Sequence, residues 1–190
     1  NGGAPPLSAW VADAYPKASW SGMVFLSAFT TKTAVYTLIR GFPGEEILIP
    51  IGIAMILYGL IYALFENEVR KILAYAIVNQ VGMMVVAVGI GSDIALDGAA
   101  AQAFVHILYK ALLIMAVGSV LYMTGRRHGT ELGGLARAMP VTFLCCLAGA
   151  ATAMALPLTA GFATKALISS GAGKAYELGA WLAIYAGAAG

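Results

Sequence analysis

The stretch "AFVHILYKALLIMAVGSV", residues 103–120, decides the fold class of this protein. Its side chains are almost all apolar, and in the run from 98 to 125 the only basic residues are His106 and Lys110, with no acidic residue. A helix needs about 20 apolar residues to cross the roughly 30 Å hydrocarbon core of a bilayer. The stretch is therefore predicted to be a membrane-spanning helix that carries two basic residues one turn apart.

The whole chain has the composition of a membrane protein. Hydrophobic residues make up 61% of it and charged residues only 11%, and the mean hydropathy is +0.85. These values lie outside the range of soluble globular domains. The formal net charge is +2 and no basic block is present, so nucleic acid is excluded as an expected partner. We expect the lipid bilayer to be the surroundings of this chain.

No motif in the sequence indicates a cofactor or a metal. Cys145 and Cys146 are adjacent in an apolar run, where two thiols act as small packing residues and have neither disulfide nor metal-site spacing. The chain has no glycine-rich dinucleotide fingerprint, haem signature or cysteine cluster for iron and sulfur. We expect no cofactor and no metal, so that any enzyme activity would belong to a larger complex.

Further uncharged runs of membrane-spanning length predict an all-α polytopic helical bundle. Residues 47–65, 72–92 and 138–164 contain no Asp, Glu, Lys or Arg, and residues 18–39 contain only Lys32. A transmembrane barrel would instead need alternating strands of about ten residues. We predict no sheet, and we predict helices near 19–40, 46–65, 70–92 and 98–124, followed by a discontinuous helix broken near Pro157.

The chain ends and the loop charges predict the organisation. Residues 1–12 read as the end of one span and 178–190 as the start of another, so we expect 1–190 to be a single transmembrane domain, a fragment of a longer subunit. If each run crosses once, most Lys and Arg residues fall on one side, which the positive-inside rule makes cytoplasmic. We expect a bacterial inner-membrane protein with these residues on that side: Lys17, Arg70, Lys71, Arg126, Arg127 and Arg137.

Three basic residues lie deep in the predicted spans, where charge is costly. Lys32 shares a helix face with Tyr36 and follows Thr31, while His106 and Lys110 are one turn apart. A charge at mid-bilayer costs about 2.5 to 3.5 kcal/mol on insertion scales. Lys32 precedes Arg40 by about 12 Å of helix, which disfavours snorkelling to the interface. We expect these side chains to face a polar interior, although a lone histidine can also simply bond a neighbouring helix.

The segment "MALPLTAGFATKALISS" contains a fourth candidate, Lys165. Pro157 lacks an amide hydrogen and disfavours a continuous helix, and broken helices at membrane depth recur at ion sites. Lys165 would lie on the second half of such a helix, or else in a loop if the span ends at Leu156. Asn79 and Gln80 lie in the middle of another run, where amides commonly form interhelical hydrogen bonds.

Protonatable side chains in a dry interior pass protons when water or hydroxyl groups bridge them. We therefore expect Lys32, His106, Lys110 and Lys165 to form one polar file across the bundle, assisted by Thr31 and Tyr36. Such a file would be a path for protons or cations.

Five motifs occur in a fixed order along the chain: "PPLSAWVADAYPKAS", "LSAFTTKTAVYTLIR", "ENEVRKILAYAIVNQVG", "FVHILYKALLIMAVGSV" and "LPLTAGFATKAL". Together they resemble the proton-translocating antiporter-like membrane subunits. That family includes the D-type membrane protein of the multisubunit Mrp-type sodium/proton antiporters and the pumping membrane subunits of NADH:quinone oxidoreductase. The resemblance covers essentially the whole chain, and the wording of "LSAFTTK" is most similar to the antiporter D type.

The resemblance implies a role for each basic residue. Lys32 matches the central lysine of the family's eighth helix, His106 and Lys110 match the basic pair of the eleventh, and Lys165 matches the exit-side residue of the broken twelfth. It also implies that the chain works among other membrane subunits of a hetero-oligomeric complex and moves protons, with sodium as a candidate second ion.

Two positions depart from the family pattern. Asn1 falls where the family has a lysine about nine residues before the tryptophan of "PPLSAW", and it cannot carry a proton in that role. Gln80 stands where many respiratory members have histidine, which favours the antiporter branch.

Three hypotheses remain open at this point. The chain is an ion-translocating subunit of a cation/proton antiporter, the equivalent subunit of a redox-driven NADH:quinone oxidoreductase, or a structural membrane-arm subunit whose polar residues only join helices.

Overall fold

The computed structural model describes residues 1–172 of the chain, which form a helical bundle. The bounds agree with the predicted spans to within a few residues, except that the helix predicted at 98–124 begins earlier than expected, at Asp93. Among the described residues there is no strand, only an isolated bridge between Glu68 and His128. The helices are α1 (Ala9–Ala14), α2 (Trp20–Phe25), the π-helical η2 (Leu26–Thr30), α3 (Thr31–Gly41), α4 (Leu48–Phe65), α5 (Val69–Ile90), α6 (Asp93–Thr124), α7 (Leu135–Ala138), α8 (Pro140–Ala153) and α9 (Ala160–Ala172), with short 3-10 turns at Tyr15–Lys17 and Gly129–Glu131.

Four helices of the described part are long and apolar enough to cross a membrane. They are the continuous rod Trp20–Gly41, formed by α2, η2 and α3, and the helices α4, α5 and α6. The shorter apolar helix Pro140–Ala153 is α8. The all-α bundle predicted from the uncharged runs is therefore confirmed.

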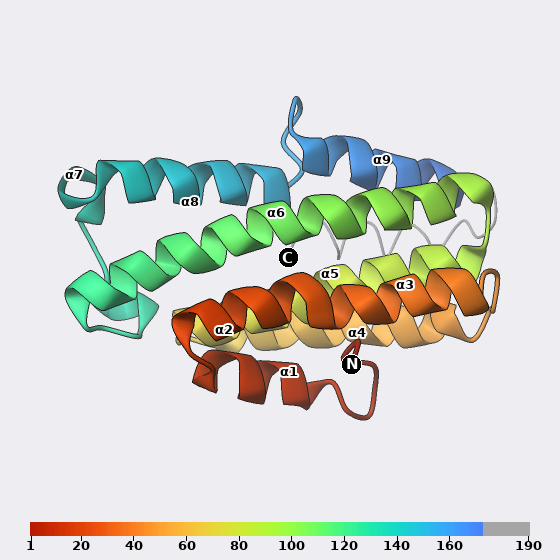
Figure 1. The fold of residues 1–190 in the computed structure, drawn as a ribbon, viewed down its shortest axis with the longest axis horizontal. Helices are drawn as coiled ribbons and strands as arrows, with labels where there is room; N and C mark the ends of the chain where they lie inside the picture. The colour runs from red at the N-terminus through yellow and green to blue at the C-terminus, as the bar shows by residue number, and fades with distance from the viewer. Residues whose placement is uncertain (173–190) are drawn as a thin grey trace.

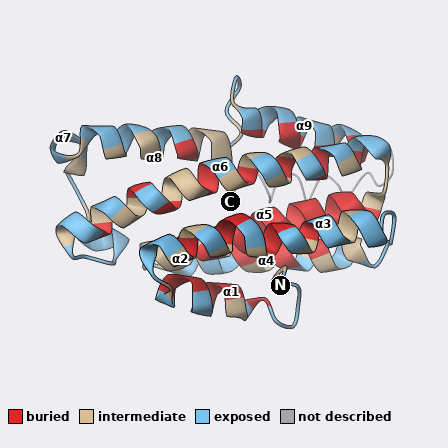
Figure 2. Cartoon of the chain, in the orientation of Figure 1, coloured by how far each residue is buried: buried red, intermediate tan, exposed pale blue. Residues whose placement is uncertain are grey.

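The bundle has two parts on either side of α6. Figure 1 shows α6 running obliquely across the molecule, with α8 and α9 along one side and the rod of α2 and α3 together with α4 and α5 on the other. Helix α5 is the most deeply buried span, and Figure 2 shows buried residues along it and on the faces turned toward it. Apart from Asn79 and Gln80, the buried residues of α5 are apolar or glycine, and they lie on all sides of the helix, which suits a central position in the bundle.

Glycines allow α4 and α5 to pack with their backbones close together. A Cβ atom on Gly52 would lie 2.7 Å from the carbonyl oxygen of Gly82, and one on Gly59 would lie 2.6 Å from that of Tyr75. No side chain fits at these distances, so both positions need glycine. Small residues at such interfaces are the usual means of close helix association in membranes.

The predicted discontinuity near Pro157 is present. Helix α8 ends at Ala153 and α9 begins at Ala160, with a loop between them in which Ala155 and Leu158 have positive φ. Pro157 cannot donate a backbone hydrogen bond, which prevents a continuous helix at this point. Gly161 lets the two half-helices meet, because a Cβ there would overlap the carbonyl oxygen of Thr152.

The expectations for the two ends of the chain have different outcomes. The expected span end at 1–12 contains only the start of the short helix α1, Ala9–Ala14. The expected start of a further span at 178–190 lies outside the described residues.

Candidate functional site

Lys32 is buried at the junction between the π-helical turn and α3. Its side chain is 7% exposed, and its Nζ donates hydrogen bonds to the carbonyl oxygen of Ser27 at 2.8 Å and to Oγ1 of Thr31 at 3.1 Å. A π-helical turn interrupts the regular backbone hydrogen-bond ladder and is frequent at functional sites. The turn thus brings a backbone acceptor within reach of a lysine that has almost no exposure to solvent.

Tyr36 does not join this buried group. Although it lies one turn after Lys32, its side chain is 59% exposed, and its hydroxyl accepts a hydrogen bond from the Arg40 guanidinium. The Lys32 side chain instead extends back toward Ser27. The shared helix face that suggested Tyr36 as a partner was therefore misleading, because the lysine points away from it.

His106 and Lys110 are both buried on one face of α6. His106 is 0% exposed and Lys110 is 3% exposed. Neither ring nitrogen of His106 has a hydrogen-bond partner among residues 1–172, and its ring packs edge-on against Tyr109 at 5.1 Å between centroids. A buried imidazole without a partner is costly, so this position is not explained by an ordinary interhelical bond within the described part.

Lys165 lies on α9 and is also buried, with 7% of its side chain exposed. Its Nζ donates a hydrogen bond of 2.7 Å to the carbonyl oxygen of Ala153, the last residue of α8. The carboxyl end of a helix carries partial negative charge, which stabilises a cationic group beside it. The structure thus places Lys165 on the second half of the broken helix, against the end of the first half.

The structure brings the four basic residues together. Lys32 lies within electrostatic range of Lys110, Lys110 lies within range of Lys165, and His106 lies within range of all three lysines. No carboxylate is among the buried polar groups of the described residues. Like charges at short range in a low dielectric repel strongly, so the protonation of each group depends on that of the others.

The amides predicted to join helices do so. Asn79 donates from Nδ2 to the carbonyl oxygen of Ile56 on α4 at 3.1 Å, and Gln80 donates from Nε2 to Oδ1 of Asn79 at 3.2 Å. Two residues that the sequence reasoning missed extend this group: Gln102 on α6 and Thr164 on α9 are both buried and hydrogen-bonded to each other. Gln102 could have been found, because it lies one helical turn before His106.

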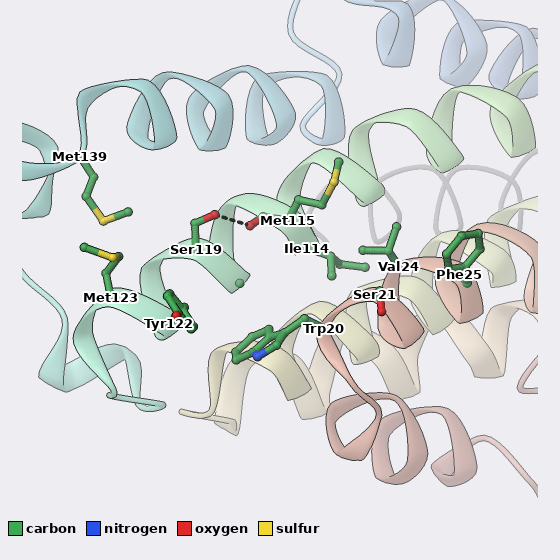
Figure 3. A pocket seen from close by; sticks show the side chains of 11 residues that line it. Trp20, Ser21, Val24, Phe25, Ile114, Met115, Ser119, Tyr122, Met123 and Met139 are labelled. Carbon is green, nitrogen blue, oxygen red and sulfur yellow. Dashed lines mark hydrogen bonds between the residues drawn. The ribbon is translucent and has the colours of Figure 1, made fainter.

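An apolar groove on the surface of the described part lies away from these residues. It has a volume of about 900 Å³ and opens between α2, the second half of α6 and the residue before α8. Figure 3 shows its lining, in which Trp20, Phe25 and Met115 contribute apolar surface, with Ser21 and Ser119 among the few polar side chains. None of the four basic residues lines it. Residues 1–172 contain no cluster of metal-ligating side chains.

Comparison with known proteins identifies structural relatives. A chain in the structure of the Mrp complex from Dietzia sp. DQ12-45-1b matches with a TM-score of 0.93 and 27% identity, covering 99% of this chain and 37% of that one. The membrane-bound sulfane sulfur reductase, an archaeal respiratory membrane complex, contains a chain that matches with a TM-score of 0.87 and 25% identity, covering 98% of this chain and 40% of that one.

The sequence relatives include subunits of NADH-quinone oxidoreductases. NADH-quinone oxidoreductase subunit N of Desulforudis audaxviator is 32% identical over 188 residues, which are 93% of this chain and 37% of the relative. NADH-quinone oxidoreductase subunit L of Escherichia coli is 32% identical over 177 residues, or 88% of this chain and 28% of the relative. The chain thus spans about a third of the length of these relatives. A family model described as "NADH:quinone oxidoreductase/Mrp antiporter, TM" matches residues 3–189. The chain therefore belongs to the NADH:quinone oxidoreductase/Mrp antiporter transmembrane family, as its five motifs indicated.

Proposed function

We propose that this chain is an ion-translocating part of a membrane subunit, and that protons pass along Lys32, His106, Lys110 and Lys165. The observation that carries the proposal is the burial of these four basic residues, each within electrostatic range of at least two of the others, with no buried carboxylate in the described part. A purely structural bundle gains nothing from such an arrangement, because every additional positive charge raises its free energy.

The electrostatic contacts suggest an order for the path. Lys32 interacts electrostatically with Lys110, and Lys110 with Lys165, while His106 interacts with all three lysines. A proton that arrives at Lys32 raises the energy of a charged Lys110 and so favours onward transfer of its proton. The ring nitrogens of His106 and the buried Ser27 hydroxyl, which have no hydrogen-bond partner among residues 1–172, supply polar atoms along this route.

We place Lys165 as the last protonatable group of the proposed path. Its amine is held by the carbonyl oxygen of Ala153, so the end of α8 stabilises the charged form there. Lys165 also repels a charged Lys110 and His106, so this contact offsets part of that repulsion when a proton reaches Lys165. The helix break is therefore part of the proposed mechanism.

We propose the cation/proton antiporter type as the best match, with sodium as the candidate second ion. The structural agreement with the Mrp complex chain, at a TM-score of 0.93, supports this assignment. The similar chains come from multisubunit membrane complexes, which supports other membrane subunits as partners of this one. Bacterial relatives support a place in the bacterial inner membrane.

A redox-driven complex is the second candidate, and the relatives named NADH-quinone oxidoreductase at 32% identity favour it. The two candidates differ in what drives proton movement. The complex that contains the chain, reconstituted in proteoliposomes, would respond to a sodium gradient in the first case and to a quinone-reducing electron donor in the second.

The decisive test of the path is Lys110→Met, which keeps the length of the side chain and removes its proton. Proton transport by the reconstituted complex should fall to background while the amount of assembled complex is unchanged. Lys110→Arg should be nearly as inactive, because a guanidinium does not release its proton. Lys17→Met is the matched control, since Lys17 is exposed in a loop turn outside the buried group. Transport by Lys110→Met at the parental rate would refute the relay and leave the structural role.

A further inference from the structure

Gln102 continues the buried face of α6 that carries the proposed path. It lies one helical turn before His106 and two before Lys110, and its side chain is 0% exposed. A carboxamide does not gain or lose a proton near neutral pH, so Gln102 cannot be a station of the path. A fully buried polar side chain at this place needs another explanation.

Both ends of the Gln102 carboxamide are hydrogen-bonded to other helices. Its Nε2 donates to Oε1 of Gln80 on α5 at 3.3 Å, and its Oε1 accepts from the hydroxyl of Thr164 on α9. One side chain therefore links three helices. Loss of either bond would leave a polar atom buried without this partner, which is costly in a dry interior.

The hydrogen bonds continue in one direction to α4. Gln80 donates to Asn79, and Asn79 donates to the carbonyl oxygen of Ile56. Each bond that joins Thr164, Gln102, Gln80, Asn79 and Ile56 has its donor on the side away from α4. The Thr164 hydroxyl also lies within hydrogen-bond distance of the carbonyl oxygens of Ala160 and Gly161 in its own helix, at 3.3 and 3.2 Å. The Ile56 carbonyl fixes the far end because it can only accept. Hydrogen bonds in such a chain polarise one another when the dielectric is low, and the chain behaves as a unit.

Thr164 connects this chain to the proposed exit residue, because it immediately precedes Lys165 on α9. The backbone reaches α9 only through the loop 154–159 after the helix break. Close packing at Gly98, where a Cβ would lie 2.9 Å from the backbone nitrogen of Ile168, sets the distance between α6 and α9. The bond between Thr164 and Gln102 adds a directional contact that fixes the rotation of α9 about its own axis.

We propose that Gln102 is a positioning residue for proton transfer, which acts through Thr164 to hold the Lys165 amine at its place relative to His106 and Lys110. The inference rests on the proposed function, since a position matters only if a proton passes between these groups. It assigns a role in transport to an uncharged residue. Transfer between neighbouring groups depends steeply on their geometry, so a small rotation of α9 would slow it.

The test compares variants that remove one hydrogen-bonding group at a time. Thr164→Val removes the hydroxyl at nearly constant volume, Thr164→Ser retains a hydroxyl, and Gln102→Leu removes the carboxamide. Thr37→Val is the matched control, because that hydroxyl is exposed on α3 and donates to the carbonyl oxygen of Thr33 in its own helix. The reconstituted complex is assayed for proton transport between roughly pH 6 and pH 9.

Thr164→Val and Gln102→Leu should each lower the maximal rate about tenfold and move the pH of half-maximal transport by at least roughly half a unit. Thr164→Ser should keep the parental rate and the parental pH of half-maximal transport. The double variant that combines Thr164→Val with Gln102→Leu should be no slower than either single variant, because the hydrogen-bond chain acts as a unit. Thr37→Val should behave like the parent.

Two results would overturn the inference. One is a parental rate and pH profile in both Thr164→Val and Gln102→Leu. The other is a rate that falls only in proportion to the amount of assembled complex, with an unchanged pH profile, since that indicates a purely structural bond. Lys110→Met separates this failure from that of the proposed function: an inactive Lys110→Met beside a parental Thr164→Val defeats only the positioning role, whereas an active Lys110→Met defeats both.

Discussion

The close packing of α4 on α5 makes Gly59→Ala a sharp test of the fold. The new Cβ would lie 2.6 Å from the carbonyl oxygen of Tyr75 and 2.7 Å from the amide nitrogen of Asn79. The shorter distance falls about 0.8 Å below ordinary van der Waals contact. Both neighbours are backbone atoms, which no change of side-chain rotamer can move, so the two helices must separate.

The size of the effect follows from two opposing terms. Replacing glycine by alanine inside a helix stabilises the helix by about 1 kcal/mol through its higher helix propensity. Overpacking lowers the free energy of unfolding by about 1 to 3 kcal/mol. Because the clash is with backbone, we expect the upper end of that range and a net loss of about 2 kcal/mol. For a chain of this size that corresponds to a fall of about 5 °C in the unfolding midpoint.

The assay is thermal unfolding of the complex in detergent, with Gly41→Ala as the matched control. Gly41 is the last residue of α3, and a Cβ there would meet no atom within 4 Å. We expect the control to unfold at the parental midpoint or slightly above it. A Gly59→Ala midpoint equal to that of Gly41→Ala would show that α4 and α5 are not packed as described.

Two further predictions concern the loops. The positive-inside rule places the loop after α6 in the cytoplasm. A cysteine introduced by Thr130→Cys should therefore react with a membrane-impermeant thiol reagent only after the membrane is opened. Labelling of this cysteine in intact cells would contradict the predicted topology. Leu158 is fully exposed and has a φ of 73°, a conformation that glycine adopts without strain, so Leu158→Gly should raise the unfolding midpoint by about 2 °C. A lowered midpoint would indicate that the leucine side chain is held by a contact of its own.

The burial of the basic residues could be predicted because the energy involved is large and local. A run of apolar residues identifies a span without reference to its neighbours, and a lysine such as Lys32 or Lys110 inside it must be compensated. The break near Pro157 was predictable for the same kind of reason, since a missing amide hydrogen acts on its own helix. These features depend on chemistry within a single segment.

Thr31, the neighbour of Lys32 in sequence, was named as its partner and accepts a hydrogen bond from it. The other partners could not be predicted, because they depend on local backbone geometry or on how separate helices meet. The sequence reasoning paired Lys32 with Tyr36 on their shared helix face, whereas the π-helical turn directs the amine to Ser27. It likewise passed over Thr164 and Gln102, which are 62 residues apart and become neighbours only when α9 packs on α6. Periodicity along one helix does not contain that information.

The length of α6 has a consequence for the membrane around the protein. The helix runs from Asp93 to Thr124, 32 residues, and is therefore about 48 Å long, well beyond the roughly 30 Å of hydrocarbon. Figure 1 shows α6 running obliquely to its neighbours. A helix longer than the hydrocarbon thickness is accommodated by tilting, so we expect the angle of α6 to the bilayer normal to follow the thickness of the lipid. Helix α6 carries Gln102, His106 and Lys110 together. Lipids with shorter acyl chains would therefore tilt the three side chains as a group and change their depth relative to Lys32 and Lys165 on the other helices.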